Sequence, residues 1–209
     1  MNKSLNDIDY IELAKQIKDW GLELGFQQIG ICDTDLAKDE KYLLKWLDQA
    51  MHGEMDYMQQ HGSKRSHPAE LIPGTIRVIS VRMDYMPEDG EDPEAILMDP
   101  QQAYISRYAT GRDYHKIIRK RLQKLAEKIA KVTGEFGYRA FTDSAPVLEK
   151  AIARNSGLGW IGKHTNLISR DYGSWLFLGE LILDCELDYD DRFEEDLCGS
   201  CTACLAACP

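Results

Sequence analysis

Apolar residues at helical spacing open the chain. Over residues 10–24 they lie three or four positions apart and the run ends at Gly25, a pattern that predicts a helix. The short apolar run Ile29–Cys32 that follows predicts a strand. A second helix is predicted over Tyr42–Met51 and onward toward Met58. We expect its methionines to fill the core, because the flexible thioether chain fits irregular gaps.

The middle of the chain predicts a strand, a loop and a long helix. Ile76–Met83 is rich in β-branched residues and predicts a strand. The acidic block 84–99, DYMPEDGEDPEAILMD, contains proline and glycine and predicts a surface loop. From Asp113 to Val132 the apolar residues outline one face of a long amphipathic helix, and Gly134 is placed to end it.

A further helix start is predicted around the sequence DSAP. Ser144 is a candidate N-cap, Pro146 would lie in the first turn, and Gly157 would end the helix. Asp143 would then lie at a helix N-terminus. Two later apolar runs predict strands, over residues 165–168 and 175–183.

Chain length and composition fit this mixture of helices and strands. With 209 residues, 44% of them apolar, the chain can bury one good core and carry a small appendix. We expect an α+β domain over residues 1–187 and the beginning of a second domain over 188–209. The first residues lack the layout of a signal peptide, and the longest apolar run, WLFLGELIL, is interrupted by Glu180. We expect a cytoplasmic monomer with no membrane partner.

Charge is distributed unevenly along the chain. The net charge is −10, from 25 Lys and Arg against 35 Asp and Glu. Residues 84–99 carry only acids and residues 180–196 are nearly as one-sided, whereas residues 107–131 are strongly basic. A negative net charge argues against a polyanionic partner. A protein whose charges are separated can still bind a polyanion through its basic segment.

Four of the six cysteines lie in one short run, CGSCTACLAACP. Cys198, Cys201, Cys204 and Cys208 follow the spacing C-x2-C-x2-C-x3-C-P of bacterial ferredoxins, whose thiolates bind 4Fe–4S clusters. A structural zinc site is the alternative, but zinc motifs favour separated CxxC pairs. The run therefore predicts an iron–sulfur redox protein.

The cysteine run does not supply all the ligands of a two-cluster module. The fourth cysteine of such a run normally binds the neighbouring cluster, so a second run is required. The sequence has only this one; Cys32 and Cys185 stand alone in apolar segments and are expected to be buried hydrophobes. We expect a truncated form of a longer protein, or a chain that borrows cluster ligands.

Three long motifs precede the cysteine run: RYATGRDYHKIIRKRL (107–122), FTDSAPVLEKAIARNSGLGWIGKHTNLI (141–168) and YGSWLFLGE (172–180). With the cysteines, they resemble in order and spacing the epoxyqueuosine reductases of bacterial tRNA modification, which are cobalamin-dependent iron–sulfur enzymes. The first hundred residues match that family more weakly, through SKRSHPAELIPG. Several long motifs followed by a ferredoxin run make coincidence improbable.

The resemblance implies both an architecture and a reaction. The N-terminal domain would be similar to nitroreductase-like and cobalamin-chaperone α+β folds, and would bind the corrinoid without its nucleotide base on the cobalt. A ferredoxin domain with two 4Fe–4S clusters would follow. Two electrons, received from an external donor, and two protons would turn the epoxide of epoxyqueuosine, at the wobble position of a tRNA with a queuosine-type anticodon, into the alkene of queuosine plus water.

The same resemblance gives Asp143 the role of proton donor to the departing oxygen. A helix N-terminus would stabilise its carboxylate and oppose that role. Burial against the corrin face would have to outweigh the dipole. A plain helix cap is the alternative role for this residue.

Four further residues are candidates for binding the corrinoid. Arg65, Lys150, Lys163 and His164 could contact its amides or its phosphate-bearing tail. For His164 a structural role is an equal alternative, and a bond to cobalt is not expected.

Lysines recur every four residues along the predicted long helix, at Lys116, Lys120, Lys124 and Lys128. This lysine stripe could bind tRNA phosphates, or it could be an ordinary solvated helix face. An anticodon nucleotide would also have to be splayed out of its stack to reach a buried metal.

Two other functions remain open on the sequence. A reductive dehalogenase-like enzyme would use related chemistry on a small molecule, but such enzymes usually carry a twin-arginine signal, and the lysine stripe would have no purpose. A noncatalytic corrinoid or electron carrier is the second alternative, which the incomplete set of cluster ligands keeps open.

Overall fold

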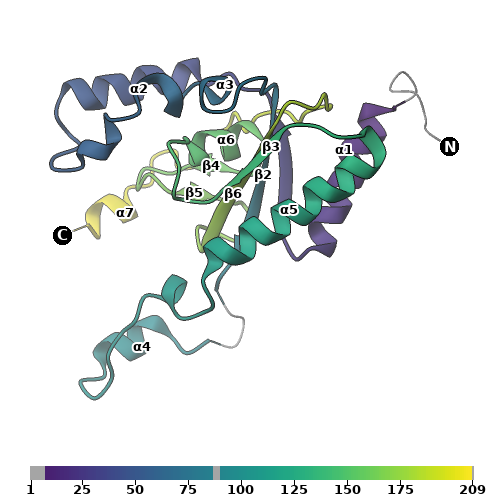
Figure 1. Cartoon of the computed structure of the whole chain (residues 1–209). Helices are drawn as coiled ribbons and strands as arrows, with labels where there is room; N and C mark the ends of the chain where they lie inside the picture. The colour runs from purple at the N-terminus through teal and green to yellow at the C-terminus, as the bar shows by residue number, and fades with distance from the viewer. Residues whose placement is uncertain (1–7, 87–89, 209) are drawn as a thin grey trace.

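The computed structural model describes residues 8–86 and 90–208. Its centre is a four-stranded sheet in the order β1-β2-β6-β3, with every neighbouring pair antiparallel (Figure 1). The strands are β1 (Gln28–Cys32), β2 (Arg77–Asp84), β6 (Leu176–Leu183) and β3 (Tyr138–Phe141). A two-stranded hairpin, β4 (Trp160–Ile161) with β5 (Leu167–Ile168), lies beyond it.

Two long helices, α1 (Tyr10–Glu23) and α5 (Tyr114–Thr133), cover one face of the sheet (Figure 1). Side chains alternate between the two faces of a strand, so β2 and β6 present Ile79, Val81, Leu181 and Leu183 to these helices. The largest hydrophobic cluster of the protein forms there, where Ile118, Leu122, Leu125 and Ile129 of α5 are fully buried.

The opposite face of the sheet packs against the short helix α6 (Glu149–Asn155). Its hydrophobic cluster includes Val78, Ile182 and Ile152. Close approach at this face requires a glycine on β1, because a Cβ at Gly30 would clash with the carbonyl oxygen of Ser156. α6 is thereby held tightly over the middle of the sheet.

The remaining elements lie around this layered centre. They are the helices α2 (Ala37–Asp48), α3 (Pro68–Leu71), α4 (Pro93–Met98) and α7 (Ala203–Ala206), with single 3-10 turns at Asp56–Met58, Gly62–Arg65 and Arg107–Ala109. α4 lies on an arm that extends away from the sheet (Figure 1). Within residues 8–86 and 90–208, no helix is long and apolar enough to cross a membrane.

Most of the predicted elements are confirmed. The first helix, the long helix and the strands β1, β2 and β6 agree with the prediction to within a few residues. Asp113 caps α5 through its side chain, and Gly134 ends it with φ +86°. Cys32 and Cys185 are buried, as expected. The strands β3 and β4 were not predicted.

The second helix and its methionines were predicted wrongly. α2 begins at Ala37, ends at Asp48 and contributes no fully buried residue. The chain then turns, with Ala50 at φ +52° and Gly53 at φ +53°, so the helix does not continue to Met58. Met51 is 61% exposed and Met55 is 42% exposed, so neither fills the core.

The predicted helix start at Ser144 is also wrong. α6 begins at Glu149, and Ser144 makes no helix cap. Ala145 precedes a proline, which disfavours the helical conformation for that residue. Residues 143–148 instead form tight turns, in which Ser144 N–H donates to Thr142 O and Val147 N–H donates to Ala145 O. Asp143 therefore does not lie at a helix N-terminus.

Most of the described residues of the acidic block 84–99 are exposed, but the block is not wholly a loop. Asp84 ends β2, and α4 occupies residues 93–98, capped by the side chain of Asp92. Residues 87–89 lie outside the described part of the chain. Pro93 occupies the first position of α4 and favours the start of a helix there, because its fixed φ suits that position.

Candidate functional site

A cavity of about 760 Å³ opens between α2 and α6. We call it the α2/α6 cavity. Its wall on the α2 side is aromatic and apolar, with Tyr42, Leu43, Trp46, Met51, Tyr57 and Met58. Its other wall comes from the turn before α6 and the first turns of that helix, including Asp143, Glu149 and Lys150. Such a cavity, largely apolar with a few charged groups, is typical of ligand sites.

Asp143 is held at the edge of this cavity by neighbours from another element. Its backbone has φ +55°, a left-handed conformation that aspartate tolerates better than most residues. The hydroxyl of Tyr114 donates to its Oδ2, and His115 Nε2 lies 3.5 Å from the same oxygen. Tyr114 is itself stacked on Phe177, with 3.8 Å between ring centroids. The start of α5 thus fixes the direction of the Asp143 carboxyl.

Beneath Asp143 lie two more carboxyl groups. Glu149 Oε1 accepts a hydrogen bond of 2.7 Å from Asp143 N–H. Glu180, on β6, is fully buried, and its carboxyl group interacts with that of Glu149. Burial, with the neighbouring carboxyl groups, raises the pKa of Glu149 to about 7 and raises the pKa of Glu180 well above its usual range.

The predicted corrinoid-binding residues separate into two groups. Arg65 and Lys150 line the α2/α6 cavity together with Asp143. Arg65 is largely buried and donates to the carbonyl oxygens of Tyr57 and Met58, so it also holds the cavity wall.

Lys163 and His164 do not line the cavity. Lys163 Nζ donates to the carbonyl oxygens of Gly199 and Cys201, at 2.7 and 2.8 Å. His164 Nδ1 accepts from Asn166 N–H within the turn of the β4–β5 hairpin. The side chains of both residues therefore stabilise nearby backbone segments through hydrogen bonds.

The cysteine run packs against the same hairpin. Trp160 Nε1 lies 3.4 Å from Cys198 Sγ, and α7 begins just before Cys204. Cys201 and Cys208 are exposed, while Cys198 and Cys204 are half-buried. Within residues 8–86 and 90–208, no three Cys, His, Asp or Glu side chains are gathered as a metal site. Pro209, the last residue of the motif, lies outside the described residues.

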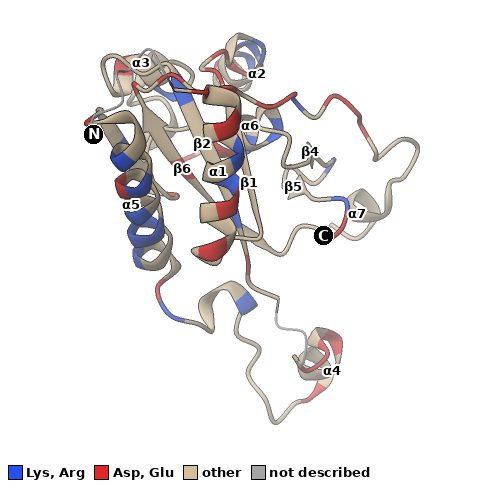
Figure 2. Ribbon diagram, turned by 90° about the vertical axis from the view of Figure 1, so that its right-hand side faces the viewer, with Lys and Arg blue, Asp and Glu red and all other residues tan. Residues whose placement is uncertain are grey.

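The lysine stripe lies along α5, where Figure 2 shows the basic positions following the helix. Lys116, Lys120 and Lys124 are exposed. Lys128 differs, because its Nζ is 2.6 Å from Glu23 Oε2 and lies over the ring of Trp20. Since α5 begins beside Asp143, the stripe leads away from the α2/α6 cavity over about 18 Å.

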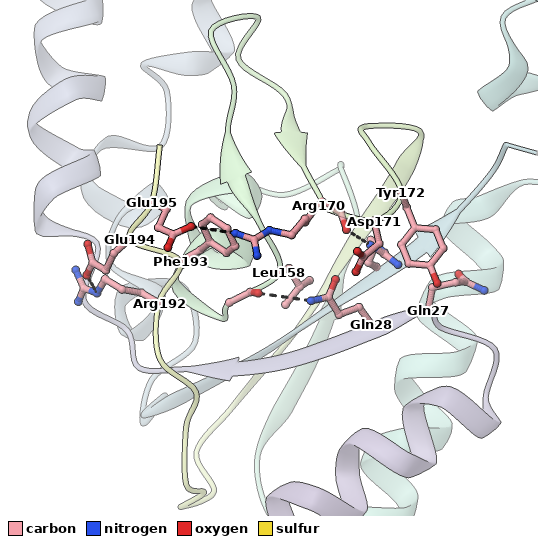
Figure 3. A pocket seen from close by; sticks show the side chains of 13 residues that line it. Gln27, Gln28, Leu158, Arg170, Asp171, Tyr172, Arg192, Phe193, Glu194 and Glu195 are labelled. Carbon is pink, nitrogen blue, oxygen red and sulfur yellow. Dashed lines mark hydrogen bonds and ion pairs between the residues drawn. The ribbon is translucent and has the colours of Figure 1, made fainter. Parts of the chain in front are cut away.

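A second cavity, of about 720 Å³, lies between β1 and the segment after β6 (Figure 3). Its charged side chains largely pair with one another, for example Arg170 with Glu195 at 3.0 Å and Arg192 with Glu194 at 3.4 Å. Asp143 does not line it. Several charged groups of this second cavity are thus already engaged with one another.

Comparisons with known proteins agree with one another. A family model described as "Epoxyqueuosine reductase QueG, DUF1730" matches residues 65–144. The epoxyqueuosine reductase of Pseudomonas aeruginosa is 59% identical over 206 residues, which cover 99% of this chain and 57% of that protein. The Escherichia coli protein is 52% identical over 202 residues, covering 97% of this chain and 53% of that one. The chain thus spans little more than half the length of these curated relatives.

Solved structures show the same similarity. Epoxyqueuosine reductase from Streptococcus thermophilus matches with a TM-score of 0.80 at 28% identity, over 95% of this chain and 53% of that one. An epoxyqueuosine reductase solved with a tRNA-Tyr epoxyqueuosine-modified stem loop matches with a TM-score of 0.79 at 25% identity, over 95% and 52%. A reductive dehalogenase linked to B12-dependent dehalogenation shares the fold alone, at 15% identity and a TM-score of 0.57, over 92% of this chain and 22% of its own.

The α+β fold is that of the epoxyqueuosine reductases and, as a fold alone, it is shared more distantly by reductive dehalogenases. Among the proteins with this fold, the chain belongs to the epoxyqueuosine reductase family.

Several residues of the site were missed on the sequence. Tyr114 was assigned to the apolar face of the long helix, and His115 was given no role because it has no metal-ligand spacing. The approach of both to Asp143 depends on the packing of α5. Glu180 did carry a signal: a single acid in the middle of the apolar run WLFLGELIL. Acidic residues are almost never fully buried without a reason, so that position called for a functional hypothesis.

Proposed function

We propose that this chain serves the reduction of epoxyqueuosine to queuosine in tRNA. The observation that carries the proposal is Asp143, held by Tyr114 at the edge of the α2/α6 cavity, in a chain 59% identical to an epoxyqueuosine reductase. A small-molecule dehalogenase is less well supported, because the similarity to that class is only 15% in sequence.

The α2/α6 cavity is suited to a corrinoid. A corrin ring has two broad apolar faces and a rim of amides, and the cavity offers an apolar and aromatic wall with Arg65 and Lys150 among its lining residues. We infer that Trp46 and the neighbouring apolar side chains contact the ring face, while Arg65 and Lys150 contact polar groups on its rim. When bound, cobalamin would supply cobalt-centred electron transfer to the substrate.

Asp143 acts in this proposal as the general acid. The departing epoxide oxygen needs a proton, and a positioned acid contributes about 100- to 10,000-fold to such a step. Tyr114 donates to one oxygen of the carboxyl, which leaves the other oxygen to face the reacting group. His115, 3.5 Å away, helps to orient the same oxygen.

The cysteine run is the proposed electron entry. We infer that Cys198, Cys201 and Cys204 bind one 4Fe–4S cluster and that Cys208 binds a second, as in two-cluster ferredoxins. Lys163 then has a role beside the cluster, because its ammonium group holds the backbone between Cys198 and Cys201. Electrons would come from an external donor protein.

The tRNA would approach along α5. Lys116, Lys120 and Lys124 are exposed, and the stripe begins near Asp143. Phosphates bound there would direct the anticodon loop toward the cavity, where the modified base would enter. The related structure solved with a tRNA-Tyr stem loop supports this class of partner.

An assay of the reconstituted protein tests the proposal. Protein loaded anaerobically with iron, sulfide and cobalamin, and supplied with a reductant, should convert epoxyqueuosine to queuosine in tRNA, as measured by mass spectrometry of the nucleosides. Retention of both cofactors without any queuosine formation would favour a carrier function instead.

A further inference from the structure

Glu180 lies at the centre of the sheet. It pairs in register with Ser80 on β2 and with Phe141 on β3, and its side chain is fully buried. Within the described residues, neither Glu180 nor Glu149 forms a salt bridge. Neither carboxyl oxygen of Glu180 has a hydrogen-bond partner there. Burial and the neighbouring Glu149 carboxyl raise the pKa of Glu180 well above its usual range, Ser80 lowers it only in part, and the protonated form is therefore favoured.

Glu149 connects Glu180 to the cavity. Glu149 Oε1 accepts a 2.7 Å hydrogen bond from Asp143 N–H, and the Glu149 carboxyl group interacts with those of Glu180 and Asp143, which change its pKa. Two carboxylates can only accept hydrogen bonds, so a bond between Glu149 and Glu180 requires that one of them carries a proton. The three groups therefore form a continuous series, from the sheet interior through the start of α6 to the cavity edge.

Several other polar and titratable groups surround these three carboxyl groups. They are Cys32 on β1, Ser80 and Arg82 on β2, Tyr114 and His115 on α5, and Lys150 on α6. Burial raises the pKa of Cys32 to about 12, so that thiol stays neutral. Arg82 is paired with Asp84, and Lys150 lines the cavity.

The proposed reaction places an unusual demand on its acid. Converting an epoxide to an alkene and water breaks both C–O bonds, so the two protons consumed both end on the departing oxygen. Asp143 has one proton to give. It must be reprotonated before it can act a second time.

We propose that Glu149 and Glu180 form an internal proton store that reprotonates Asp143 during turnover. The Asp143 carboxylate takes the proton of the Glu149 carboxyl, Glu149 in turn takes the proton of Glu180, and the store is refilled from water through the α2/α6 cavity. No electrons move in these steps. The inference deepens the proposed function and rests on it for the identity of the proton acceptor.

The first test needs no substrate. Infrared titration of the 209-residue chain should show protonated carboxyl groups that persist above about pH 6, with one titrating near pH 7. Glu149→Gln and Glu180→Gln should each remove such a signal. Glu135→Gln, at an exposed site outside this cluster, is the matched control and should leave the signals unchanged. A wild-type spectrum without protonated carboxyls above that pH would overturn the proposal.

The second test is the pH dependence of turnover in the reconstituted protein. Glu149→Gln should lower kcat about tenfold or more at pH 8 with little effect on KM, and Glu149→Asp should restore part of it. Glu180→Gln should move the alkaline limb of the profile to lower pH. Profiles identical to wild type in both variants would contradict the proposed proton store. If the infrared signals are present but wild-type protein makes no queuosine, the carboxyl store stands and the proposed function fails.

Discussion

At the scale of single residues, Asp143 shows how a proposed catalytic group can be placed without a helix. Its left-handed backbone, its N–H bond to Glu149 and its carboxyl bond to Tyr114 fix it from three directions. Uncommon backbone conformations persist only where the surroundings enforce them, and they cluster at functional sites. The helix dipole expected to oppose proton donation does not act on Asp143, since α6 begins six residues later.

Asp143→Asn should abolish proton donation while preserving the fold. Asparagine is nearly isosteric, tolerates a left-handed conformation and keeps an oxygen for the Tyr114 bond. We expect turnover of epoxyqueuosine tRNA to fall about 100-fold or more. Cobalamin retention must be measured on the same preparation, because its loss would point to a cofactor contact. Wild-type turnover in this variant would remove Asp143 as the donor.

The buried glutamates make a prediction about stability. The pKa of Glu149 is about 7 and that of Glu180 is higher than usual, so the folded chain binds protons that the unfolded chain releases above about pH 4.3. The free energy of unfolding should therefore fall as pH rises from about 5 to 8, by about 1.4 kcal/mol per pH unit for each proton that the folded chain still binds and the unfolded chain has lost. Glu180→Gln should flatten that dependence in chemical denaturation, and an equally steep fall would argue against a protonated Glu180.

At the scale of secondary-structure elements, α5 serves both the core and the surface. Its apolar face is fully buried against the sheet, while its lysines are not equivalent. Three are exposed, whereas Lys128 pairs with Glu23 of α1. A four-residue repeat advances about 400° on a helix, so the stripe drifts around the axis and its last member reaches the neighbouring helix.

This difference gives a paired test of the lysine stripe. Changing Lys116, Lys120 and Lys124 together to Gln should weaken tRNA binding and reduce the slope of log K against log salt by about 0.7 to 0.9 for each phosphate that is no longer neutralised. Lys128→Gln alone should change that slope less, because its charge is engaged by Glu23. Equal slopes for the triple variant and the wild type would show that the stripe is only a solvated face.

The β4–β5 hairpin acts as a support for the cysteine run. Lys163 binds two carbonyl oxygens of that run, and Trp160 lies against Cys198. We expect Lys163→Met to lower the iron retained after anaerobic reconstitution, since the loop loses two charge-assisted hydrogen bonds. Lys131→Met, on the exposed end of α5, is the control and should retain wild-type iron content. Equal iron content in both variants would contradict a supporting role for Lys163.

At the scale of the whole molecule, the α2/α6 cavity forms between segments far apart in the sequence. Trp46 comes from α2, and Asp143 comes from the turn after β3. We expect cobalamin to co-elute with the chain in gel filtration, with a spectrum in which the nucleotide base has left the cobalt. Trp46→Ala should reduce retention, whereas Trp175→Ala, outside the cavity, should not. Free-cobalamin spectra without co-elution would contradict cobalamin binding in this cavity.

The sequence by itself determined the periodic elements and the family, and it predicted the chemistry of the short motifs. The spacing of apolar residues over 113–132 defined α5, because burial of one face follows directly from helical geometry. The cysteine spacing indicated an iron–sulfur run, and the long motifs identified the family. Each of these signals is local, so no knowledge of packing was needed.

Only the tertiary structure decided which side chains meet. Asp143, Tyr114 and Glu180 come from three elements that the folded sheet brings together, and no pattern along the chain encodes that contact. The same applies to Lys163, whose ammonium group reaches the cysteine run and not the cavity. The pKa of a carboxyl group depends on its burial, and its burial depends on all the elements that pack around it. The carboxyl series could therefore be seen only once α6 was placed over the sheet.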